Sequence, residues 1–370
     1  MPEGHSVHRI ARQFAANFVG QRVAAISPQG RFVDGAARVS GHQMVDAFAV
    51  GKQMFLEFET GDWIRVHLGI YGAWDFSGQI DMDATIASAN GRMGQTNMRG
   101  TVLDGAGENS LSSIGAPRRA RVRMGEQTSD GRLSSAEHDR RLSSAGRDRR
   151  LSSAQLDRRL SSAENDRRLS SAEGAYRSPA DSFPPEPVGA VRLRLFTDVV
   201  CADLRGPTAC DLLDATEVAA VIARLGPDPA RDKSKAAETR FVTTVTAKPT
   251  PIGQLLMDQS VVAGIGNVYR AEMLFRAGIT PYRPGKLVTT DEARALWRDW
   301  VKLLAIGIET GQMMTRDGLR GQALRDALAR RDDRHWVYKR EGLPCRKCGT
   351  AIALEVMATR KLYWCPSCQV

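Results

Sequence analysis

The spacing of apolar residues divides the chain into a β-rich first half and a helical second half. Residues 5–20 carry apolar side chains at helical spacing and end in a glycine, which predicts a helix at the start of the chain. From residue 22 to about residue 73 the pattern is strand-like instead. Two short β-rich runs, 55–59 and 63–68, are separated by a Thr-Gly-Asp turn, so this region predicts strands.

Two further segments, 120–124 and 190–196, alternate strictly, and each predicts a half-buried strand with arginines on one face. After residue 206 the spacing becomes helical. Thr289 and Glu292 form a capping box at the start of the longest helical pattern. The predicted helices of this half are 210–225, 232–246, 251–262, 268–277 and 289–311.

A nine-residue repeat interrupts the β-rich half. An Arg-Leu-Ser-Ser-Ala unit recurs from about residue 131 to residue 173, and each repeat contains one leucine at the same position. So few apolar residues build neither a core nor a helical stripe, so we predict a disordered insert at about 125–187. Its arginines leave two interpretations open, an inert surface loop or a weak, nonspecific attraction to DNA.

Net charge narrows the class of partner. The formal charge of +10 favours a polyanion such as nucleic acid, although a basic surface without such a partner remains open. No run of about 18 apolar residues occurs, and no apolar stretch follows the polar start of the chain. We therefore expect no membrane helix and no signal peptide, and an intracellular protein.

Four of the six cysteines fall within the last 26 residues, in two Cys-x-x-Cys pairs separated by sixteen residues. This spacing is typical of a four-thiolate zinc site, with two chance pairs as the alternative. Four cysteine ligands leave no coordination position for water, so we predict one structural Zn²⁺. The predicted ligands are Cys345, Cys348, Cys365 and Cys368. The residues between the pairs predict a β-hairpin with Thr359, Arg360 and Lys361 at its tip, a basic probe suited to DNA.

The chain starts Met-Pro-Glu-Gly-His. If Met1 is removed, Pro2 becomes a nucleophilic secondary amine that can form an iminium ion with an aldehyde. Glu3 then places a carboxylate beside that amine as a proton donor or acceptor. An ordinary frayed tail is the alternative, because most chain termini have no fixed structure.

A glycine turn between two predicted helices contains Gly264 and Gly266 and is followed by Asn267. Backbone amides at such a turn suit a phosphate, and the Asn267 amide can join them; simple helix packing is the alternative. Lys52 follows a glycine before an apolar run and is either a functional cation or a solvated strand end. Ile70 and Tyr71 lie in a short glycine-flanked loop. Such a pair is either a wedge for a disrupted base stack or part of the core.

These segments together resemble the formamidopyrimidine-DNA glycosylase and endonuclease VIII family. The resemblance covers nearly the whole chain apart from the repeats. It rests on Pro2-Glu3-Gly4, Gly51-Lys52, the segment from His67 to Gly72, the segment from Asp258 to Tyr269, and the four-cysteine finger.

The resemblance implies an α+β fold: an N-terminal β-sandwich with a leading helix, a helix–two-turns–helix domain and a C-terminal four-cysteine zinc finger. The implied domains are 1–206, 207–311 and 312–370, with the finger at 340–370. It further implies a bifunctional glycosylase and abasic-site lyase that acts on damaged DNA. We expect no small-molecule cofactor, and a monomer is the default because the sequence carries no oligomeric signal. The implied location is the bacterial cytoplasm, in association with the nucleoid.

The resemblance also implies residue roles. Pro2 attacks C1′ of a flipped-out nucleotide, Glu3 protonates the opening sugar, and Lys52 contacts phosphate or assists elimination. Asn267 and Arg360 grip the phosphates beside the lesion. The strand is nicked by β- and δ-elimination.

The substrate branch follows from two departures. Gly253 stands where the formamidopyrimidine branch commonly carries lysine, and the Ile70-Tyr71 loop is more like endonuclease VIII. Both favour oxidised pyrimidines. The alternatives are a purine-directed enzyme acting on 8-oxoguanine or formamidopyrimidines, and a DNA-binding protein of the same fold that has lost catalysis.

Overall fold

The computed structural model describes residues 2–81, 113–115, 183–330 and 333–370. All of them belong to one compact unit, which comprises Met1–Met124 and Phe183–Val370. The strand predicted at 120–124 and the repeats at 131–173 lie outside the described residues.

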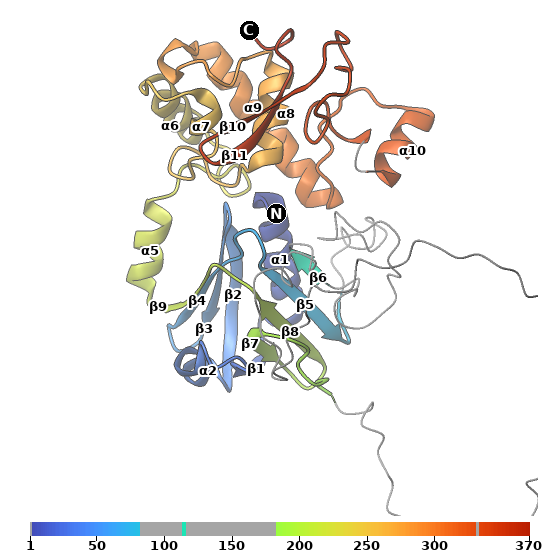
Figure 1. Cartoon of the computed structure of the whole chain (residues 1–370). Helices are drawn as coiled ribbons and strands as arrows, with labels where there is room; N and C mark the ends of the chain where they lie inside the picture. The colour runs from blue at the N-terminus through green and yellow to red at the C-terminus, as the bar shows by residue number, and fades with distance from the viewer. Residues whose placement is uncertain (1, 82–112, 116–182, 331–332) are drawn as a thin grey trace, which may run out of the picture. The chain divides into compact units, whose positions relative to one another are not determined.

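The first helix, α1, spans Gly4–Asn17, with Glu3 as its N-cap residue. Its apolar stripe, which includes Val7, Ile10 and Phe14, is fully buried, so the predicted leading helix is confirmed. A shorter helix, α2 (Val33–Val39), interrupts the region that the sequence predicts as strands. Figure 1 shows both helices beside the strands of the N-terminal sheet.

The described strands of this half form one antiparallel ladder of nine, in the order β6-β5-β8-β7-β1-β2-β3-β4-β9. They are β1 (Arg22–Ile26), β2 (His42–Val50), β3 (Gln53–Phe58), β4 (Trp63–His67), β5 (Ala73–Gly78), β6 (Ser113–Gly115), β7 (Val191–Phe196), β8 (Val200–Arg205) and β9 (Ala209–Leu213).

The ladder is thin at one point, because β1 and β2 pair only at Arg22↔Gln43 and Val23↔His42. Side chains from both sides of this junction, for example Leu56 and Leu204, bury themselves in one core together with the apolar stripe of α1. The predicted β-sandwich with a leading helix is therefore confirmed.

One expectation for β7 was wrong. The strand was predicted to be half-buried with its arginines on one face, but Arg194 exposes only 3% of its surface and is buried. Its Nε and Nη2 donate to the two carboxylate oxygens of Asp203 at 2.7 and 2.9 Å. Arg205 joins the network by donating to Asp75 and to Asp203. Buried charges persist only when paired in this way, and alternation alone does not reveal the partners.

The second half is helical, as predicted. Its helices are α5 (Ala215–Ala223), α6 (Lys235–Thr246), α7 (Ile252–Leu255), α8 (Asn267–Ala277), the short 3₁₀ turn η3 (Gly285–Leu287), α9 (Thr290–Thr310) and α10 (Gly321–Ala329). The capping box of Thr289 and Glu292 begins α9, and Gly311 ends it in the left-handed conformation. None of the helices in the described part of the chain is long and apolar enough to cross a membrane.

Two helix predictions had wrong boundaries. The segment 210–225 starts as strand β9, because residues 209–213 pair with β4, and its helix begins only after the Asp214 capping box. The segment 251–262 contains only the four residues of α7, and the remainder forms turns held by Asp258 and Gln259 side chains. Strand pairing replaces the helix in the first segment, and side-chain bonds to the backbone compete with helix formation in the second.

The C-terminal finger contains the predicted hairpin, formed by β10 (Ala353–Met357) and β11 (Arg360–Trp364). Its two-residue turn, Ala358 and Thr359, has positive φ at both positions, 48° and 64°. This is the geometry of a tight type I′ hairpin turn. Arg360 and Lys361 consequently begin the returning strand beside the tip.

Candidate active site and zinc site

The Glu3 carboxylate lies at the N-terminus of α8 and is completely buried. It accepts hydrogen bonds from the backbone amides of Val268 at 2.8 Å, Gly266 at 3.2 Å and Tyr269 at 3.3 Å. The first turn of a helix has free amides and a positive dipole end, so it stabilises an anion there. Glu3 is thus held in place and does not belong to a frayed tail.

This contact is possible because two of the residues at it are glycines, which have no Cβ. A Cβ at Gly266 would lie 2.4 Å from Cδ of Glu3, and a Cβ at Gly4 would lie 2.8 Å from Cα of Gly264. The Gly4 amide also donates to the Gly264 carbonyl at 2.9 Å. The backbone at the start of α1 therefore packs directly against the backbone of the glycine turn.

The sequence predicts that the backbone amides of this turn bind a phosphate, but in the structure they bind side chains of the protein. The Gly266 amide serves Glu3, and the Gly264 amide donates to Oε1 of Gln259 at 3.0 Å. Both amides are therefore engaged inside the protein, and the anion at this helix start is a carboxylate of the chain itself.

Pro2 is buried directly before Glu3. Since Glu3 is fixed by three amides, the position of Pro2 is restricted as well. The two predicted catalytic residues therefore lie together at the meeting point of α1 and α8.

Lys52 reaches the same point from the turn between β2 and β3. Its Nζ donates to the Ile265 carbonyl at 2.5 Å, between the two glycines of the turn. The pKa of Lys52 is lowered to about 8, chiefly by burial and to a smaller extent by the Arg360 charge, while the Glu3 charge opposes both effects. Lys52 is accordingly a half-buried amine whose pKa lies close to neutral pH, and not a solvated strand end.

His67, at the end of β4, is a neighbour of Lys52 that the sequence indicates only as part of a longer motif. It pairs with Gln53, the residue after Lys52. Burial, then the charge of Lys52, then that of Arg65 lower the pKa of His67, so its imidazole is neutral at physiological pH. A neutral imidazole can donate one hydrogen bond without adding charge.

Asn267 is the first residue of α8, and its side chain contacts the finger. Its Nδ2 donates to the Lys361 carbonyl at 2.8 Å. Arg270, one helical turn further on, donates from Nη2 to Oδ1 of Asn267 and to the same carbonyl at 3.0 Å. The structure therefore places Asn267, a predicted DNA contact, against Lys361 next to the hairpin tip of the finger.

No sequence motif singles out Arg270, which is fully buried in the structure. Burial lowers its pKa to about 10, with Glu3 opposing and Arg360 adding to the effect, so it remains a cation at neutral pH. Its Nε and Nη1 find no hydrogen-bond partner within the described ranges. A lone arginine in a helical pattern gives no sign of such burial.

Ile70 and Tyr71 occupy the turn between β4 and β5. Ile70 exposes 41% of its surface, whereas Tyr71 is half-buried, so this turn does not form part of the core at Ile70. The turn is tight, because a Cβ at Gly72 would lie 2.3 Å from the Leu68 carbonyl oxygen.

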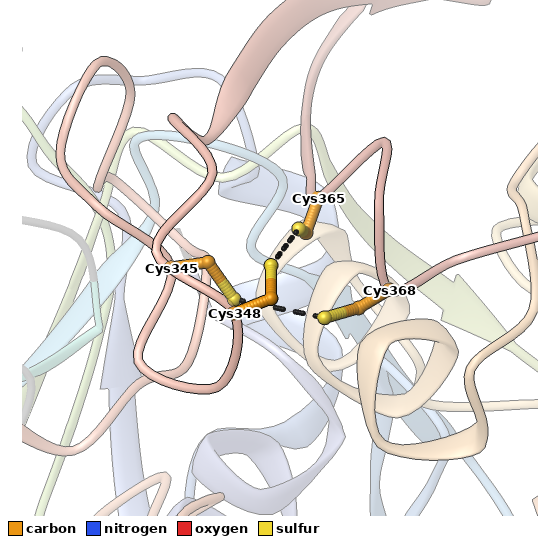
Figure 2. Close-up of side chains that lie close together, drawn as sticks. All are labelled: Cys345, Cys348, Cys365 and Cys368. Carbon is orange, nitrogen blue, oxygen red and sulfur yellow. Dashed lines mark hydrogen bonds between the residues drawn. The ribbon is translucent and has the colours of Figure 1, made fainter.

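The four predicted cysteine ligands converge, as Figure 2 shows. Their Sγ atoms all lie within 4.8 Å of one another, with Cys348 and Cys365 at 3.5 Å and Cys345 and Cys368 at 3.9 Å. Tetrahedral Zn²⁺ with Zn–S bonds of about 2.3 Å requires sulfur separations of about 3.8 Å. The four thiolates therefore fit one structural zinc, which holds the finger together.

The arrangement combines a buried N-terminal segment, a carboxylate on a helix dipole and an amine with a lowered pKa. Basic groups of the finger and of α8 adjoin them. Such a set suits amine-based covalent chemistry on a substrate that carries phosphates.

Three family profiles match the chain in order. Residues 1–104 match the formamidopyrimidine-DNA glycosylase N-terminal domain, residues 225–318 the H2TH domain of the same enzymes, and residues 342–370 a zinc finger found in FPG and IleRS.

Known proteins agree with these matches. "Endonuclease 8 1" of Mycobacterium tuberculosis is 32% identical over 369 residues, which covers 100% of both chains. The formamidopyrimidine-DNA glycosylase of Thermus thermophilus is 38% identical over 157 residues, 40% of this chain and 55% of that protein.

Solved structures share the fold. The MutM (Fpg) protein of Thermus thermophilus superposes with a TM-score of 0.58 at 21% identity and covers 100% of this chain and 98% of that one. Lactococcus lactis Fpg in complex with DNA that contains an abasic site gives 0.58 at 16% identity, covering 100% and 99%. The end-to-end relative and the three ordered profiles establish that the chain belongs to the formamidopyrimidine-DNA glycosylase and endonuclease VIII family, the DNA glycosylases and abasic-site lyases of base-excision repair.

Proposed function

We propose that this enzyme removes oxidised pyrimidines from DNA through a covalent intermediate on Pro2 and then nicks the strand by β- and δ-elimination. The observation that carries the proposal is the fixed position of Pro2-Glu3 beside Lys52 and the first turn of α8.

The reaction follows from these groups. The Pro2 nitrogen, freed by loss of Met1, bonds to C1′ of the flipped-out nucleotide while the base leaves with the glycosidic electrons and takes up a proton from solvent water. Glu3, as a carboxylate, accepts the amine proton and can return it to the opening sugar oxygen. The iminium ion acidifies the C2′ proton, so its removal expels the 3′ phosphate. A second elimination expels the 5′ phosphate, and water releases Pro2.

Lys52 suits the proton transfers in the elimination steps, because a pKa of about 8 leaves an appreciable neutral fraction near physiological pH. Asn267 and Arg360 are the proposed phosphate contacts, with Arg270 behind them as a buried cation. In the free protein the Asn267 amide is engaged with the Lys361 carbonyl. Phosphate binding would therefore exchange one hydrogen bond for another.

Oxidised pyrimidines are favoured over purines at two positions. The first is Gly253, where a Cβ would lie 2.8 Å from Sδ of Met357 and 3.0 Å from the Pro281 carbonyl oxygen. A lysine there, as in the purine-directed branch, meets backbone directly. The second is the exposed Ile70 with Tyr71, a pair able to fill the gap that a flipped base leaves. The name of the mycobacterial relative, Endonuclease 8 1, supports the same choice.

Borohydride trapping on duplex DNA with an abasic site tests the chemistry. We expect one reduced protein–DNA adduct, and peptide mass spectrometry should locate it on the nitrogen of Pro2 in a chain that lacks Met1. An adduct on Lys52, or a mature chain that retains Met1 and forms no adduct, would contradict the mechanism.

Comparing excision rates tests the substrate class. Duplexes with dihydrouracil or thymine glycol should be cut faster than a duplex with 8-oxoguanine opposite cytosine. The reverse order would favour the purine-directed alternative and leave the Pro2 chemistry intact.

A further inference from the structure

A buried carboxylate, Asp228, joins two segments of the active site to a loop behind them. It lies between α5 and α6 and exposes 4% of its surface. Its Oδ2 accepts from the Gly51 amide at 2.6 Å and from Nε2 of His8 at 2.8 Å. Its Oδ1 accepts from the Ala230 amide at 2.9 Å.

The two donors on Oδ2 belong to the catalytic segments. His8 lies on α1, the helix that Glu3 caps, and Gly51 immediately precedes Lys52. Gly51 cannot be held by a side chain of its own, because a Cβ there would lie 2.9 Å from the Gly264 amide nitrogen. The bond from its amide to Asp228 is therefore a direct constraint on the turn that carries Lys52.

The carboxylate is well suited to this task because it keeps its charge. Burial alone would raise the pKa of Asp228, but the hydrogen bond and charge of His8, with the amides of Gly51 and Ala230, outweigh burial and lower it. Hydrogen bonds to a charged acceptor are roughly twice as strong as neutral ones. Without His8 the buried charge would depend on the two amides alone.

We propose that Asp228 and His8 are a positioning pair that fixes the Gly51–Lys52 turn beside Pro2 and Glu3. The proposal rests on the proposed function for its kinetic consequence, since Lys52 matters there for elimination. The structural consequence, which is the burial of the Lys52 amine, is independent of the proposed function. Neither residue touches the reacting atoms, so each acts through Lys52.

The surroundings of His8 provide a specific test. His8 lines a cavity of about 280 Å³, whose wall also includes Arg12, Phe48 and Glu309. A cavity of this volume admits free imidazole, which can replace the ring of a truncated His8. Restored activity would identify the ring as the missing group, which a general loss of stability would not produce.

The experiment uses the full chain with four substitutions. Asp228→Asn and His8→Ala remove the pair, His8→Gln keeps an N–H donor, and Glu309→Gln changes the same cavity wall without touching Asp228. Single-turnover cleavage of abasic-site DNA gives the rate. Binding to a duplex with a tetrahydrofuran site gives Kd, and thermal unfolding shows that each variant is folded.

We expect Asp228→Asn and His8→Ala to cleave about tenfold more slowly or worse, because small misplacements of catalytic groups are costly, with Kd changed by less than about twofold. His8→Gln should retain most of the rate, and Glu309→Gln all of it. Imidazole should accelerate His8→Ala and leave Asp228→Asn unchanged. Wild-type rates in both folded variants, or equal acceleration of both by imidazole, would overturn the proposal.

A second readout is independent of catalysis. The pH dependence of Lys52 acetylation, followed by peptide mass spectrometry, reports the pKa of its amine. If the pair fixes the turn, Asp228→Asn should let water reach Lys52 and raise its pKa from about 8 toward the ordinary value of 10.5. An unchanged pKa would refute the positioning role even if Pro2 forms its adduct. A raised pKa with no adduct in the wild type would refute only the proposed function.

Discussion

Replacing Lys52 by methionine should stabilise the protein at neutral pH, even though it removes a group of the active site. Burial lowers the pKa of Lys52 from 10.5 to about 8. Each tenfold change in proton affinity is worth about 1.4 kcal/mol, so holding the ammonium in place at pH 7 costs about 3 kcal/mol. Functional sites commonly carry such a cost.

Two losses offset part of the gain. The variant lacks the bond from Nζ to the Ile265 carbonyl, but that oxygen still accepts from Nε2 of Gln259 at 3.1 Å. Glu3 loses a neighbouring positive charge, but it keeps its three backbone amides. Both partners therefore stay satisfied, and we expect a net stabilisation of about 1 to 3 kcal/mol, within the range of about 1 to 4 kcal/mol found when buried ion pairs are replaced by apolar groups.

The pH dependence separates the charge effect from packing, which does not titrate. A folded-state pKa below the unfolded value means that the unfolded chain binds more protons between about pH 8 and pH 10.5, so wild-type stability rises with pH across this window. The advantage of Lys52→Met is therefore largest below pH 8. It should narrow by about 2 kcal/mol between pH 7 and pH 9.5.

Urea unfolding of both proteins at several pH values measures this difference. Lys286→Met serves as the matched control, because Lys286 is exposed and its replacement should change stability by less than about 0.5 kcal/mol at any pH. A stability gap that stays constant from pH 7 to pH 9.5 would refute the argument, since it would mean that the Lys52 amine is not held in a charge-disfavouring environment.

Three further results follow from single contacts. Removing zinc with a chelator should abolish DNA binding by unfolding the finger; unchanged binding after zinc loss verified by mass spectrometry would contradict this. Glu272→Gln should lower the free energy of unfolding by about 2 to 4 kcal/mol, because the buried carboxylate accepts from the Thr315 hydroxyl and three backbone amides, and urea unfolding measures the loss. Gly266→Ala should reduce Pro2 trapping at least tenfold while the protein stays folded, because the new Cβ would lie 2.4 Å from Cδ of Glu3; normal trapping would show that Glu3 can move without consequence.

Local signals determined what the sequence could predict. The helix α1, the capping box of α9 and the finger hairpin each follow from residues close together in the chain, and the structure contains them. The zinc ligands follow from spacing alone, because the metal imposes its geometry on them. Strand β9 and the turns after α7 were assigned to helices because their bonds are made by distant strands or by side chains.

The sequence indicates candidate site residues but not their contacts. Motifs predict Pro2, Glu3, Lys52 and Asn267 as site residues, yet nothing local indicates that Glu3 binds amides more than 260 residues away. The same limit applies to Asp228, which an ordinary Gly-Pro-Asp-Pro loop conceals. A charged residue is usually exposed, so sequence reasoning assigns such residues to the surface unless a partner is known.

Glu3 and Asp228 share a property that bears on how this active site tolerates change. Each is a buried carboxylate that accepts backbone amides from a distant segment, Glu3 at the start of α8 and Asp228 at the turn before Lys52. Backbone amides are present whatever the side chain, so substitutions at Val268 or Tyr269 leave the donors of Glu3 in place. The glycines that permit the close approach have no such freedom. The positions of Pro2 and Lys52 therefore depend on two carboxylates and on the glycines that let the backbones approach them.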